Sequence, residues 1–580
     1  MHAAIAPYSS FVPFTKNLTH APKWPHLLSY TTCINTSRKQ LEQFIWNSEK
    51  YPHFSTTRFS LYLHYNLLVM YKVFSFLFLF FFIAPQLRSQ IFPKEDSKLN
   101  YRLIGFSVPP VSGADSYTIQ IAQGRYNDAD SFKKNITQTI PLDANKKIIE
   151  VPAFGTQYTW RVIYKGSDQK KTGHLYHFTT GTIPEVDPKI NRVNILTPAK
   201  KYRDAFILAD ANGVMYDMKG NPLWYLPPTD KIITSDIRDL KLTPFGTLTL
   251  LTATKPYEVD YNGNILWTCP DSSKATTNIE KNIHLYHHEF TRLSNGHYMS
   301  LATEDMVLCK MPTEDDNTFI IYDTPITKKD NTKKYRNGSF GALIEYDEQG
   351  KVVWLWRVAK YIERSDLIYR FGPKDKMDLH DNAFYFDEQN KVICLSFRNI
   401  SRVIKIKYPE GNVLNTYGNI YKKGGVYKPG LHENGNDLFT GQHAAKYSSK
   451  GFLYLFDNDN GDSDVAPKVL VMKEPAIGNG WPEIIWKYTC AISEKEKQMG
   501  FLPNSGGGNV IELPDGSFFI CMGGILSKSM IVNADKEILW SAFSEKYDVD
   551  GKTWKMHTSY RQSIITDRKD LEQLIWNSEK

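Results

Sequence analysis

The sequence predicts an all-β protein in which a small β-sandwich precedes a six-bladed β-propeller. Short strands with alternating apolar residues fill residues 97–183. From about residue 184 to 565, a unit of strand, turn and strand recurs with a period near 43 residues. Glycine and proline occur throughout, and 13% of the 580 residues are aromatic. This composition is typical of a β-rich protein with many turns, and the length allows a large core.

The region before residue 97 is predicted to carry an export signal. "MYKVFSFLFLFFFIAPQLRSQ" at 70–90 contains a Met, a Lys, a short apolar run and then the small residue Ser89. This is the layout of a secretory signal peptide, and the apolar run is too short for a comfortable membrane span. We therefore expect residues 70–89 to be a signal peptide. The processed protein is then periplasmic or secreted, with no stable membrane span.

Nearly the same stretch occurs close to both ends of the chain. "LEQFIWNSEK" at 41–50 nearly repeats "LEQLIWNSEK" at 571–580. We interpret residues 1–69 as an extraneous extension, made of the tail of a tandem neighbouring copy and translated spacer, so that the true start is Met70. The alternative is a genuine extension with a membrane anchor. N-terminal sequencing of the mature protein distinguishes the two, because a mature end just after the signal peptide supports the first interpretation.

Residues 97–183 indicate a small β-sandwich of fibronectin type III appearance. The strands alternate or cluster β-branched and aromatic residues between Gly, Asp and Lys turns. The clearest strands are at 116–123, 147–152, 158–164 and 174–180. So short a segment with this pattern fits one sandwich domain. Its polar residues do not converge, so we expect a packing or interaction role.

The propeller at 184–565 is predicted from a repeated Asp–Trp unit. "YDMKGNPLW", "VDYNGNILW" and "YDEQGKVVW" end at Trp224, Trp267 and Trp354, each with an Asp seven residues earlier, at Asp217, Asp260 and Asp347. The Trp spacings are 43 and 87, or one period and two. "VNADKEILW", ending at Trp540, is a degenerate copy. Each unit predicts strand, Asn-Gly-type turn and strand, and the period is that of a propeller blade with about four strands.

Insertions reduce the number of blades. About nine periods fit arithmetically between 184 and 565, but insertions at 310–340, 360–378 and 408–436 lower the count, and we expect six blades. Residues 566–580 then form a C-terminal tail. The functional site of a propeller normally lies at the central channel, where polar residues distant in sequence can meet.

Charge and cysteine content exclude several classes of function. The formal net charge of +8 is modest for this length, and no dense Lys/Arg block predicts a nucleic-acid partner. The six cysteines include no CxxC pair, which argues against zinc ribbons and thioredoxin-like sites. Most are expected to be buried, inert thiols, while a disulfide between two of the last five stays open.

Three histidine motifs and one serine motif share a placement before an apolar strand and a tight turn. They are "HHEFTRLSNGHYM" at 287–299, "DLHDNAFYFDEQNKVICLSFRN" at 378–399, "TGQHAAKYSSKGFLYLFDND" at 440–459 and "NSGGGNVIELPDGSFFI" at 504–520. We expect these motifs to face one channel at corresponding points of successive blades. The candidate site residues are His287, His288, His380, Asn382, Arg398, His443 and Ser505.

This set is rich in imidazoles and short of carboxylates. Strand alternation predicts that Glu289 points elsewhere. Three histidines could bind zinc, but a guanidinium such as Arg398 is repelled by a divalent cation and instead suits a tetrahedral oxyanion such as sulfate or phosphate. We therefore expect no metal. A neutral imidazole can also be a nucleophile that takes a sulfuryl or phosphoryl group. A lone histidine before a strand is more often a hydrogen-bonded structural residue, so that interpretation stays open for each motif.

Over about residues 97–565 the chain resembles the bacterial arylsulfate sulfotransferase family. The motifs that carry the resemblance are "HHEFTRLSNGHYM", "LHDNAFYFDEQNKVICLSFRN", "QHAAKYSSKGFLYLFDN" and "GGGNVIELPDGSFF". The 18 residues from His380 to Arg398 make the second motif fairly specific, whereas "LPDGS" alone is weak. The resemblance implies an N-terminal β-sandwich, a six-bladed propeller and transfer of a sulfuryl group between phenols without the nucleotide donor PAPS.

The resemblance also implies roles for individual residues. His443 matches the family's nucleophile, which becomes transiently sulfated. His380 and Arg398 match the groups that grip the sulfuryl oxygens, and Asn382 matches a substrate-contacting Asn. The paired-histidine motif supplies a further catalytic histidine, His288 or His287.

Ser505 falls near a polar contact of the family. Elsewhere the chain departs from the family pattern. Residues 411–442 contain no Cys, although the family often has a short cysteine-bridged loop there. The acidic residue usual after the Gln-His pair is replaced by Ala444.

The implied reaction is a ping-pong transfer from an aryl sulfate to a phenol. It requires no metal, nucleotide or other cofactor, which fits the absence of a Gly-rich phosphate loop. Family analogy implies a homodimer. Two other functions are weighed against it. One is a non-catalytic propeller that binds a ligand or partner at the channel, and the other is a metal-dependent propeller hydrolase or lyase.

Overall fold

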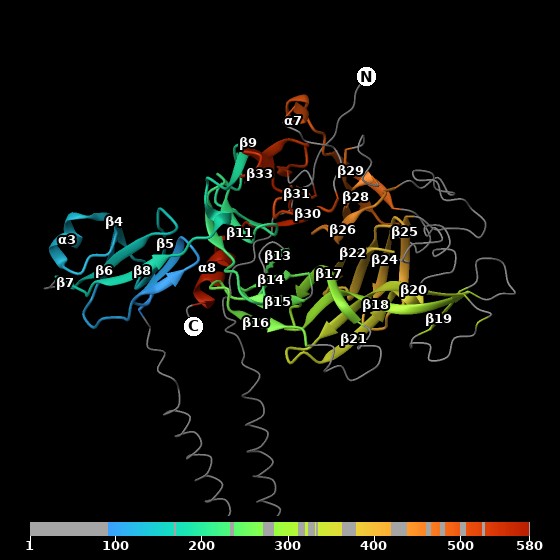
Figure 1. Cartoon of the computed structure of the whole chain (residues 1–580), viewed down its shortest axis with the longest axis horizontal. Coiled ribbons are helices and arrows are strands. Elements are labelled where there is room, and N and C mark those ends of the chain that lie inside the picture. The colour runs from blue at the N-terminus through green and yellow to red at the C-terminus, as the bar shows by residue number, and fades with distance from the viewer. Residues whose placement is uncertain are drawn as a thin grey trace, which may run out of the picture. The chain divides into compact units, whose positions relative to one another are not determined.

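The computed structural model is nearly all β, which confirms the predicted fold class (Figure 1). It describes residues 91–166, 170–232, 237–253, 255–270, 283–310, 319–322, 331, 334–361, 379–418, 438–459, 466–475, 482–498, 506–524 and 528–578. The predicted extension, the signal peptide and Ser505 lie outside the described residues. None of the described helices is long and apolar enough to cross a membrane.

The N-terminal described region forms two β-sheets. Its elements are β1 (Ser97–Leu99), β2 (Leu103–Ser107), β3 (Ser116–Gln123), α3 (Ala129–Lys134), β4 (Ile136–Pro141), β5 (Lys146–Glu150), β6 (Gln157–Lys165), β7 (Lys170–Thr172) and β8 (Tyr176–Thr180). The larger sheet has the order β1-β8-β6-β3-β4, with β7 on β6, and the smaller pairs β2 with β5. Phe106 on β2 packs edge-on against Trp160 on β6, with ring centroids 5.1 Å apart, so the two sheets share a core. The four predicted strands correspond to β3, β5, β6 and β8.

Six further antiparallel sheets follow in the described part of the chain, after the short helix η1 (Pro184–Val186). The first contains β10 (Phe206–Ala209), β11 (Val214–Asp217), β12 (Pro222–Tyr225) and β35 (Gln562–Ile565). The second contains β13 (Arg238–Leu242), β14 (Leu248–Leu251), β15 (Pro256–Val259) and β16 (Ile265–Thr268). The third contains β17 (Ile283–Arg292), β18 (Tyr298–Lys310), β19 (Phe319–Tyr322), β20 (Lys334–Tyr346) and β21 (Val352–Arg357), which precedes α5 (Val358–Tyr361).

The last three sheets have the same up-and-down plan. The fourth contains β22 (Asp381–Asp387), β23 (Val392–Phe397), β24 (Arg402–Lys407) and β25 (Val413–Gly418). The fifth contains β26 (His443–Tyr447), β27 (Leu453–Asp457), β28 (Lys468–Lys473) and β29 (Glu483–Thr489), followed by α7 (Glu494–Gln498). The sixth contains β30 (Asn509–Glu512), β31 (Phe518–Met522), β32 (Lys528–Val532), β33 (Ile538–Asp548), β34 (Thr553–Met556) and, beside β33, β9 (Asn191–Thr197).

The repeated Asp of the sequence closes the turn between the last two strands of a unit. The carboxylate of Asp217 accepts hydrogen bonds from the backbone of Lys219 and Asn221, and Gly220 N donates to Asp217 O at 3.0 Å. Gly220 has φ 86°, in the left-handed region that glycine adopts without a steric penalty. The same backbone bond occurs at Asp260 and Asp347. The predicted strand–turn–strand unit is therefore confirmed at these positions.

The repeated Trp joins one sheet to the next. Trp224 on β12 donates from its indole nitrogen to Tyr261 O in the second sheet at 2.6 Å. Equivalent bonds run from Trp354 to Pro409 O and from Trp486 to Ala534 O, both at 2.8 Å. Trp540, in the sixth sheet, donates to Met218 O in the first sheet at 3.0 Å. The series of bonds therefore returns to the sheet from which it began.

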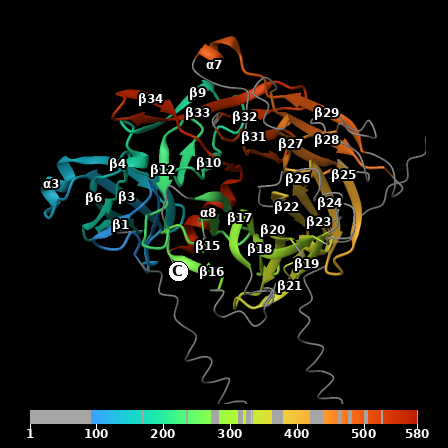
Figure 2. The ribbon, with the colours of Figure 1, turned by 45° about the vertical axis from the view of Figure 1, so that its right-hand side comes forward.

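The first strands of successive sheets are also neighbours. Contacts join β35 to β13, β13 to β17, β17 to β22, β22 to β26 and β26 to β30. Asn509 of β30 donates to Gln562 O of β35 at 2.8 Å, which links the last sheet to the first. Figure 2 shows β17, β22 and β26 close to one another. Because the late strand β35 pairs with β10, a β-ladder joins the two ends of this region. Their description as six propeller blades stays a prediction.

Bulges interrupt the first strands where the predicted site residues lie. The pairing register shifts between Arg238 and Lys241 in β13, between Tyr286 and Phe290 in β17, and between His443 and Lys446 in β26. Non-glycine residues with positive φ occur at or just before these first strands: Asp239 (55°), His288 (61°), His380 (57°) and Ala444 (53°). Such backbone costs about 1–3 kcal/mol per residue and clusters at functional sites. The bulges redirect side chains that regular alternation would place elsewhere.

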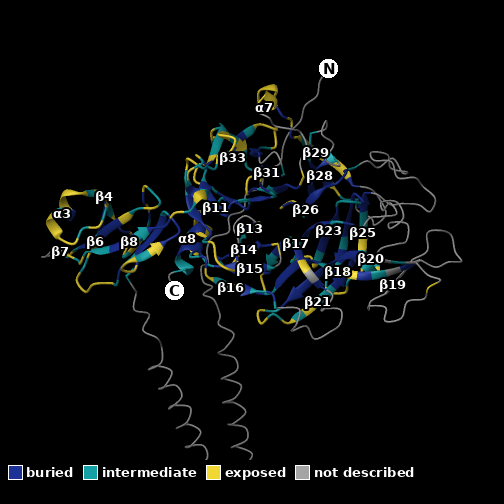
Figure 3. Cartoon of the chain, in the orientation of Figure 1, coloured by how far each residue is buried: buried dark blue, intermediate teal, exposed yellow. Residues whose placement is uncertain are grey.

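The segment predicted as a C-terminal tail forms helix α8 (Arg568–Asn577). Asp567 caps it by accepting a hydrogen bond from Lys569 N at 2.8 Å. Leu571, Leu574 and Ile575 are buried in an apolar cluster with residues of both N-terminal sheets and of the first two later sheets. In Figure 3 many of the strands are also coloured as buried. The tail is therefore part of the core.

The described cysteines are buried, as expected. Burial raises the pKa of the Cys394 and Cys490 thiols to about 12, so both stay protonated near neutral pH. They behave as core residues rather than as reactive thiols.

Candidate active site

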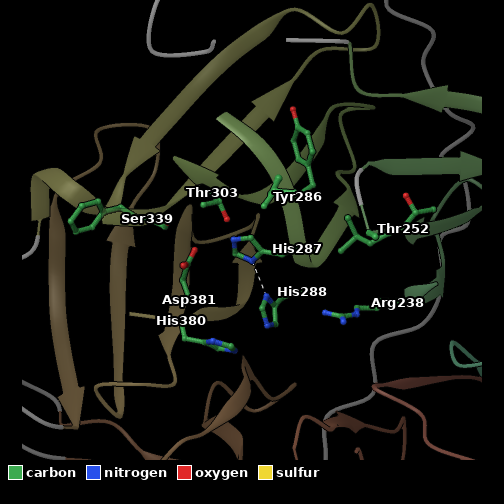
Figure 4. A pocket seen from close by; sticks show the side chains of 13 residues that line it. Arg238, Thr252, Tyr286, His287, His288, Thr303, Ser339, His380 and Asp381 are labelled. Atoms are coloured by element: carbon green, nitrogen blue, oxygen red, sulfur yellow. Dashed lines mark hydrogen bonds between the residues drawn. The ribbon is translucent and has the colours of Figure 1, made fainter. Parts of the chain in front are cut away.

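The structure brings predicted site residues together at the beginnings of neighbouring first strands (Figure 4). His287 and His288 lie on β17, His380 directly precedes β22, and His443 begins β26. Arg398 follows β23, and its backbone nitrogen donates to His380 O at 2.9 Å. Residues from three separate sheets therefore contribute to one site.

His287, His288 and His380 line a cavity of about 340 Å³. The ring centroids of His288 and His380 are 4.8 Å apart. The rest of the lining is largely apolar, with Leu251, Leu285, Tyr286 and Phe340, and also includes Asp381. A cavity with an apolar wall and convergent polar groups is the usual form of a small-molecule site, and this wall suits an aromatic ring.

The paired histidines are joined by a hydrogen bond between their Nδ1 atoms. His287 Nδ1 and His288 Nδ1 are 2.8 Å apart, the contact drawn dashed in Figure 4. One of the two nitrogens must donate and the other accept, because two N–H groups cannot face each other at this distance. Burial, reinforced by the charges of His287 and His380, lowers the pKa of His288 well below its ordinary value. His288 is therefore a neutral imidazole at neutral pH.

His443 is held in one tautomer by Asn458. Its Nδ1 lies 2.6 Å from Asn458 Oδ1, while Asn458 Nδ2 donates to Gly507 O at 2.7 Å. The second bond fixes the amide with its oxygen toward His443, so Nδ1 must carry the proton and donate it. The lone pair of the neutral ring is then on Nε2, which is the nitrogen that can act as a nucleophile.

Burial also lowers the pKa of His443 well below its ordinary value. His443 is 2% exposed, and the positive charges of Arg561 and Arg398 further disfavour its protonated form, while the bond from Asn458 opposes this shift. Nε2 of His443 is consequently unprotonated at neutral pH. Ala444, which replaces the usual acidic residue, leaves no defect in orientation because Asn458 supplies the bond to Nδ1.

Of the two predicted substrate contacts, Asn382 is described by the structure and Ser505 is not. Asn382 is fully buried, and its Nδ2 donates to Gln442 O at 2.7 Å, directly before His443. Asn382 thus supports the backbone of the site, and its contact with substrate stays a prediction. Ser505 lies outside the described residues, so its role also stays a prediction.

Tyr560 and Arg561 were not predicted from the sequence to lie near the histidines. The ring centroid of Tyr560 lies 5.7 Å from that of His288 and 6.3 Å from that of His443. Arg561 is 4% exposed, and its Nη2 donates to Asn382 O at 2.7 Å. Neither residue belongs to a histidine motif. The available signal was weaker: both precede the apolar strand β35, in the same placement as the predicted site residues.

The expectation that Glu289 points away from the site was wrong. Its Oε2 lies 3.2 Å from Arg561 Nη1 and accepts from Phe384 N at 3.2 Å. Alternation fails here because the bulge in β17 lies between Tyr286 and Phe290. Burial by itself would raise the pKa of Glu289, but Arg561 and two nearby lysines lower it to about 2. Glu289 is therefore the ionised partner of the central guanidinium.

Among the described residues, the one group of three possible metal ligands lies outside this cavity. It consists of Glu95, Asp96 and His177 in the N-terminal region. His177 Nδ1 is 2.7 Å from Glu95 Oε1, and Arg125 pairs with Asp96. These contacts describe an ion-pair network, and the described histidines of the cavity have no equivalent set of carboxylates around them.

Residues 310–476 match the family model described as Arylsulfotransferase (ASST). The matched segment includes β22 to β28 and so contains His380, Arg398 and His443. The predicted resemblance is confirmed, and an aryl sulfotransferase is the kind of enzyme that the family indicates.

No curated protein matches this chain. Among solved structures, it is similar to a protein of unknown function from Bacteroides caccae, with 10% identity, 63% of this chain and 99% of that chain covered, and a TM-score of 0.35. A putative 6-phosphogluconolactonase from Bacteroides fragilis has 10% identity, 79% and 99% coverage, and a TM-score of 0.23. Similarity this low bears on neither the fold nor the activity of this chain.

Proposed function

We propose that this chain transfers a sulfuryl group from an aryl sulfate ester to a phenolic acceptor, by a ping-pong mechanism and independently of PAPS. The intermediate is a sulfohistidine on Nε2 of His443. The observation that carries the proposal is the bond from His443 Nδ1 to Asn458, which leaves the lone pair on Nε2. The positive charges of Arg561 and Arg398 act on His443, and the cavity lined by His287, His288 and His380 has a largely apolar wall. This combination suits the charge and the ring of an aryl sulfate.

In the first half-reaction, Nε2 of His443 attacks the sulfur of the donor. The N–S bond forms as the bond from sulfur to the aryl oxygen breaks, and that electron pair leaves on the phenolate. Negative charge on the sulfuryl oxygens is stabilised by Arg398, His380 and His288, which are held in place before the reaction begins. A proton from a neighbouring histidine assists departure when the phenol is a poor leaving group.

In the second half-reaction, the acceptor phenol enters the same cavity. Its hydroxyl proton passes to a neighbouring imidazole, His288 or His380, as its oxygen attacks sulfur. The O–S bond forms, the N–S bond breaks, and His443 recovers its lone pair. The aromatic ring rests against the apolar wall in both halves. Because His443 is 2% exposed, the small sulfuryl group reaches it while the ring stays in the cavity.

The proposed architecture, export and assembly are those that the sequence predicts. The six sheets are the blades of a β-propeller, preceded by a fibronectin III-like β-sandwich at 97–183. The site lies at the central channel, where the first strands meet. The protein is exported by the signal peptide at 70–89 and forms a homodimer. The distribution of Trp bonds and the closing strand β35 support the propeller.

The direct test is the mass of the protein after incubation with para-nitrophenyl sulfate and no acceptor. We expect a gain of one sulfuryl group on the peptide that contains His443, and its loss when phenol is added. A non-catalytic binding protein would bind the ester without this gain. A metal-dependent hydrolase would release nitrophenol continuously, stop when treated with a chelator, and form no adduct.

Replacing Asn458 by Leu is expected to lower kcat of transfer by about 100-fold with little change in KM. Leu is similar in size to Asn but cannot accept the Nδ1 proton, so the tautomer with its lone pair on Nε2 is no longer enforced. Stopped-flow measurement of nitrophenol release checks both constants. The Asn458→Asp variant provides the control, because it keeps the acceptor and its charge should move the acid limb of the pH profile upward. Equal loss in both variants, with no change in profile, would indicate a purely structural role.

The lowered pKa values predict activity that persists in mild acid. An ordinary histidine near pKa 6.5 would be mostly protonated at pH 5.5, whereas His443 and His288 gain protons only at lower pH. We therefore expect the first half-reaction to keep most of its rate as pH falls from 7.5 to about 6. Rapid-quench measurement of the nitrophenol burst tests this. A limb centred at the ordinary histidine pKa would contradict it.

A further inference from the structure

A second cavity adjoins the histidine cavity. It has a volume of about 290 Å³ and shares Arg238 and Ala253 with its neighbour. Figure 4 shows the guanidinium of Arg238 beside His288, on the far side from His380. Tyr560, whose ring lies near both His288 and His443, lines the second cavity. A substrate that reaches past Arg238 would therefore have one end at the histidines and the other in the second cavity.

The second cavity is lined by cations that lack carboxylate partners. Arg238 lies over the Tyr560 ring, with its guanidinium carbon 5.3 Å from the ring centroid. Neither Arg238 nor Lys546, an exposed residue of β33, forms an ion pair with any carboxylate that the structure describes. Glu185 is the single acidic residue among the described residues of the lining. Burial, with the charge of Lys546, lowers the pKa of His557 to about 4, so His557 is neutral. The lining keeps a net positive charge.

The same cavity contains a buried hydrogen-bond acceptor that no described residue satisfies. Asn212 is 3% exposed, and its Nδ2 donates to Tyr216 Oη at 2.6 Å. That bond fixes the amide, and Asn212 Oδ1 has no partner among the described residues. A buried acceptor left without a donor is costly, so water or a bound molecule is expected to supply one. This marks the cavity as a polar site.

We infer that the second cavity binds a carboxylate carried by the phenolic acceptor, so that phenolic acids are preferred over neutral phenols. The inference rests on the proposed function, since it assigns the acceptor's phenol to the histidine cavity. The carboxylate pairs with Lys546 and with the shared Arg238, whose planar fork matches a carboxylate in geometry. Tyr560 separates the two ends, and its ring faces the acceptor between them.

The test compares para-hydroxyphenylpropionate with its methyl ester as acceptors for the wild-type protein. The two have the same shape near the phenol and differ in the charge of the distant group. We expect KM for the acid to be about fivefold lower than for the ester, as for a charge-assisted contact to exposed cations. In Lys546→Met, KM for the acid should rise about fivefold, and KM for the ester should stay within twofold. Lys487→Met, an exposed lysine of β29 that lines neither cavity, should change neither value.

The inference is overturned if acid and ester have equal KM in the wild-type protein, or if Lys546→Met shifts both alike. Calorimetric titration of the acid into unreacted protein distinguishes failure of this inference from failure of the proposed function. If no phenol is sulfurylated but Lys546→Met weakens binding of the acid, the anion site stands and the transferase proposal fails. If the ester is sulfurylated and the acid gains nothing, the transferase stands and this inference fails.

Discussion

Replacing His443 by Ala is expected to abolish sulfuryl transfer, with kcat/KM falling by about 10⁴-fold or more. The imidazole Nε2 is the atom that forms the covalent bond in the proposed mechanism, and no described neighbour can replace it. The nearest other imidazoles, His288 and His380, face the cavity and are assigned to the sulfuryl oxygens. The measurement is nitrophenol release with and without phenol, together with the mass of the protein, which should show no adduct.

Controls separate loss of chemistry from loss of fold. His443→Asn keeps a polar side chain at the start of β26 and should be as inactive as His443→Ala, while its thermal unfolding midpoint stays near the wild-type value. His297→Ala serves as a matched control, because His297 lies beyond β17 and bonds to Glu345 rather than to the site. Substantial transfer by a folded His443 variant, with an adduct elsewhere, would remove the central claim.

The sequence predicted those features that depend on local chemistry. The Asp–Gly turns were visible because a carboxylate, a left-handed glycine and a following Trp recur at fixed spacing. What the Trp contacts was not visible, because the bond from Trp540 to Met218 joins residues at opposite ends of the region. The role of the segment after residue 566 was missed for a similar reason, since the core that buries α8 is built from distant strands.

In the candidate site, too, the features set by local sequence were predictable and the contacts between distant residues were not. The histidines share a placement before apolar strands, so the sequence predicted that they meet. Glu289 was misplaced because a bulge breaks the alternation on which the argument relied. Asn458 and Arg561 lie outside the shared pattern, and their functions depend on which atoms they face. A tautomer is fixed by one hydrogen bond, which no spacing in the sequence reveals.

Two buried carboxylates stabilise the buried guanidinium of Arg561. Its Nη1 lies 3.3 Å from Asp239 Oδ1 and 3.2 Å from Glu289 Oε2, from β13 and β17. Lys241 also contacts both carboxylates, at 2.7 and 3.5 Å. Asp239 and Glu289 therefore offset the charges of Arg561 and Lys241, while burial lowers the pKa of His288 and of His443 and keeps both neutral.

Replacing Arg561 by Met is expected to lower the free energy of unfolding by about 3–5 kcal/mol, because it leaves two buried carboxylates short of a partner. Urea unfolding at pH 7 measures the loss. Arg192→Met is the matched control: its pair with Glu545 is largely exposed on the arginine side, so a change below about 1 kcal/mol is expected.

The pH dependence of the Arg561→Met loss tests its electrostatic origin. In the wild-type protein the pKa of Glu289 is about 2, so its paired form contributes stability above the ordinary glutamate pKa and loses it as pH falls. Without Arg561, burial raises the pKa of Glu289, and the carboxylate can take a proton in the folded state. The difference between wild type and variant should therefore shrink as pH falls from 7 toward 4. The double variant Arg561→Met with Glu289→Gln should recover part of the lost stability. A loss that is the same at every pH and in the double variant would assign Arg561 a packing role alone.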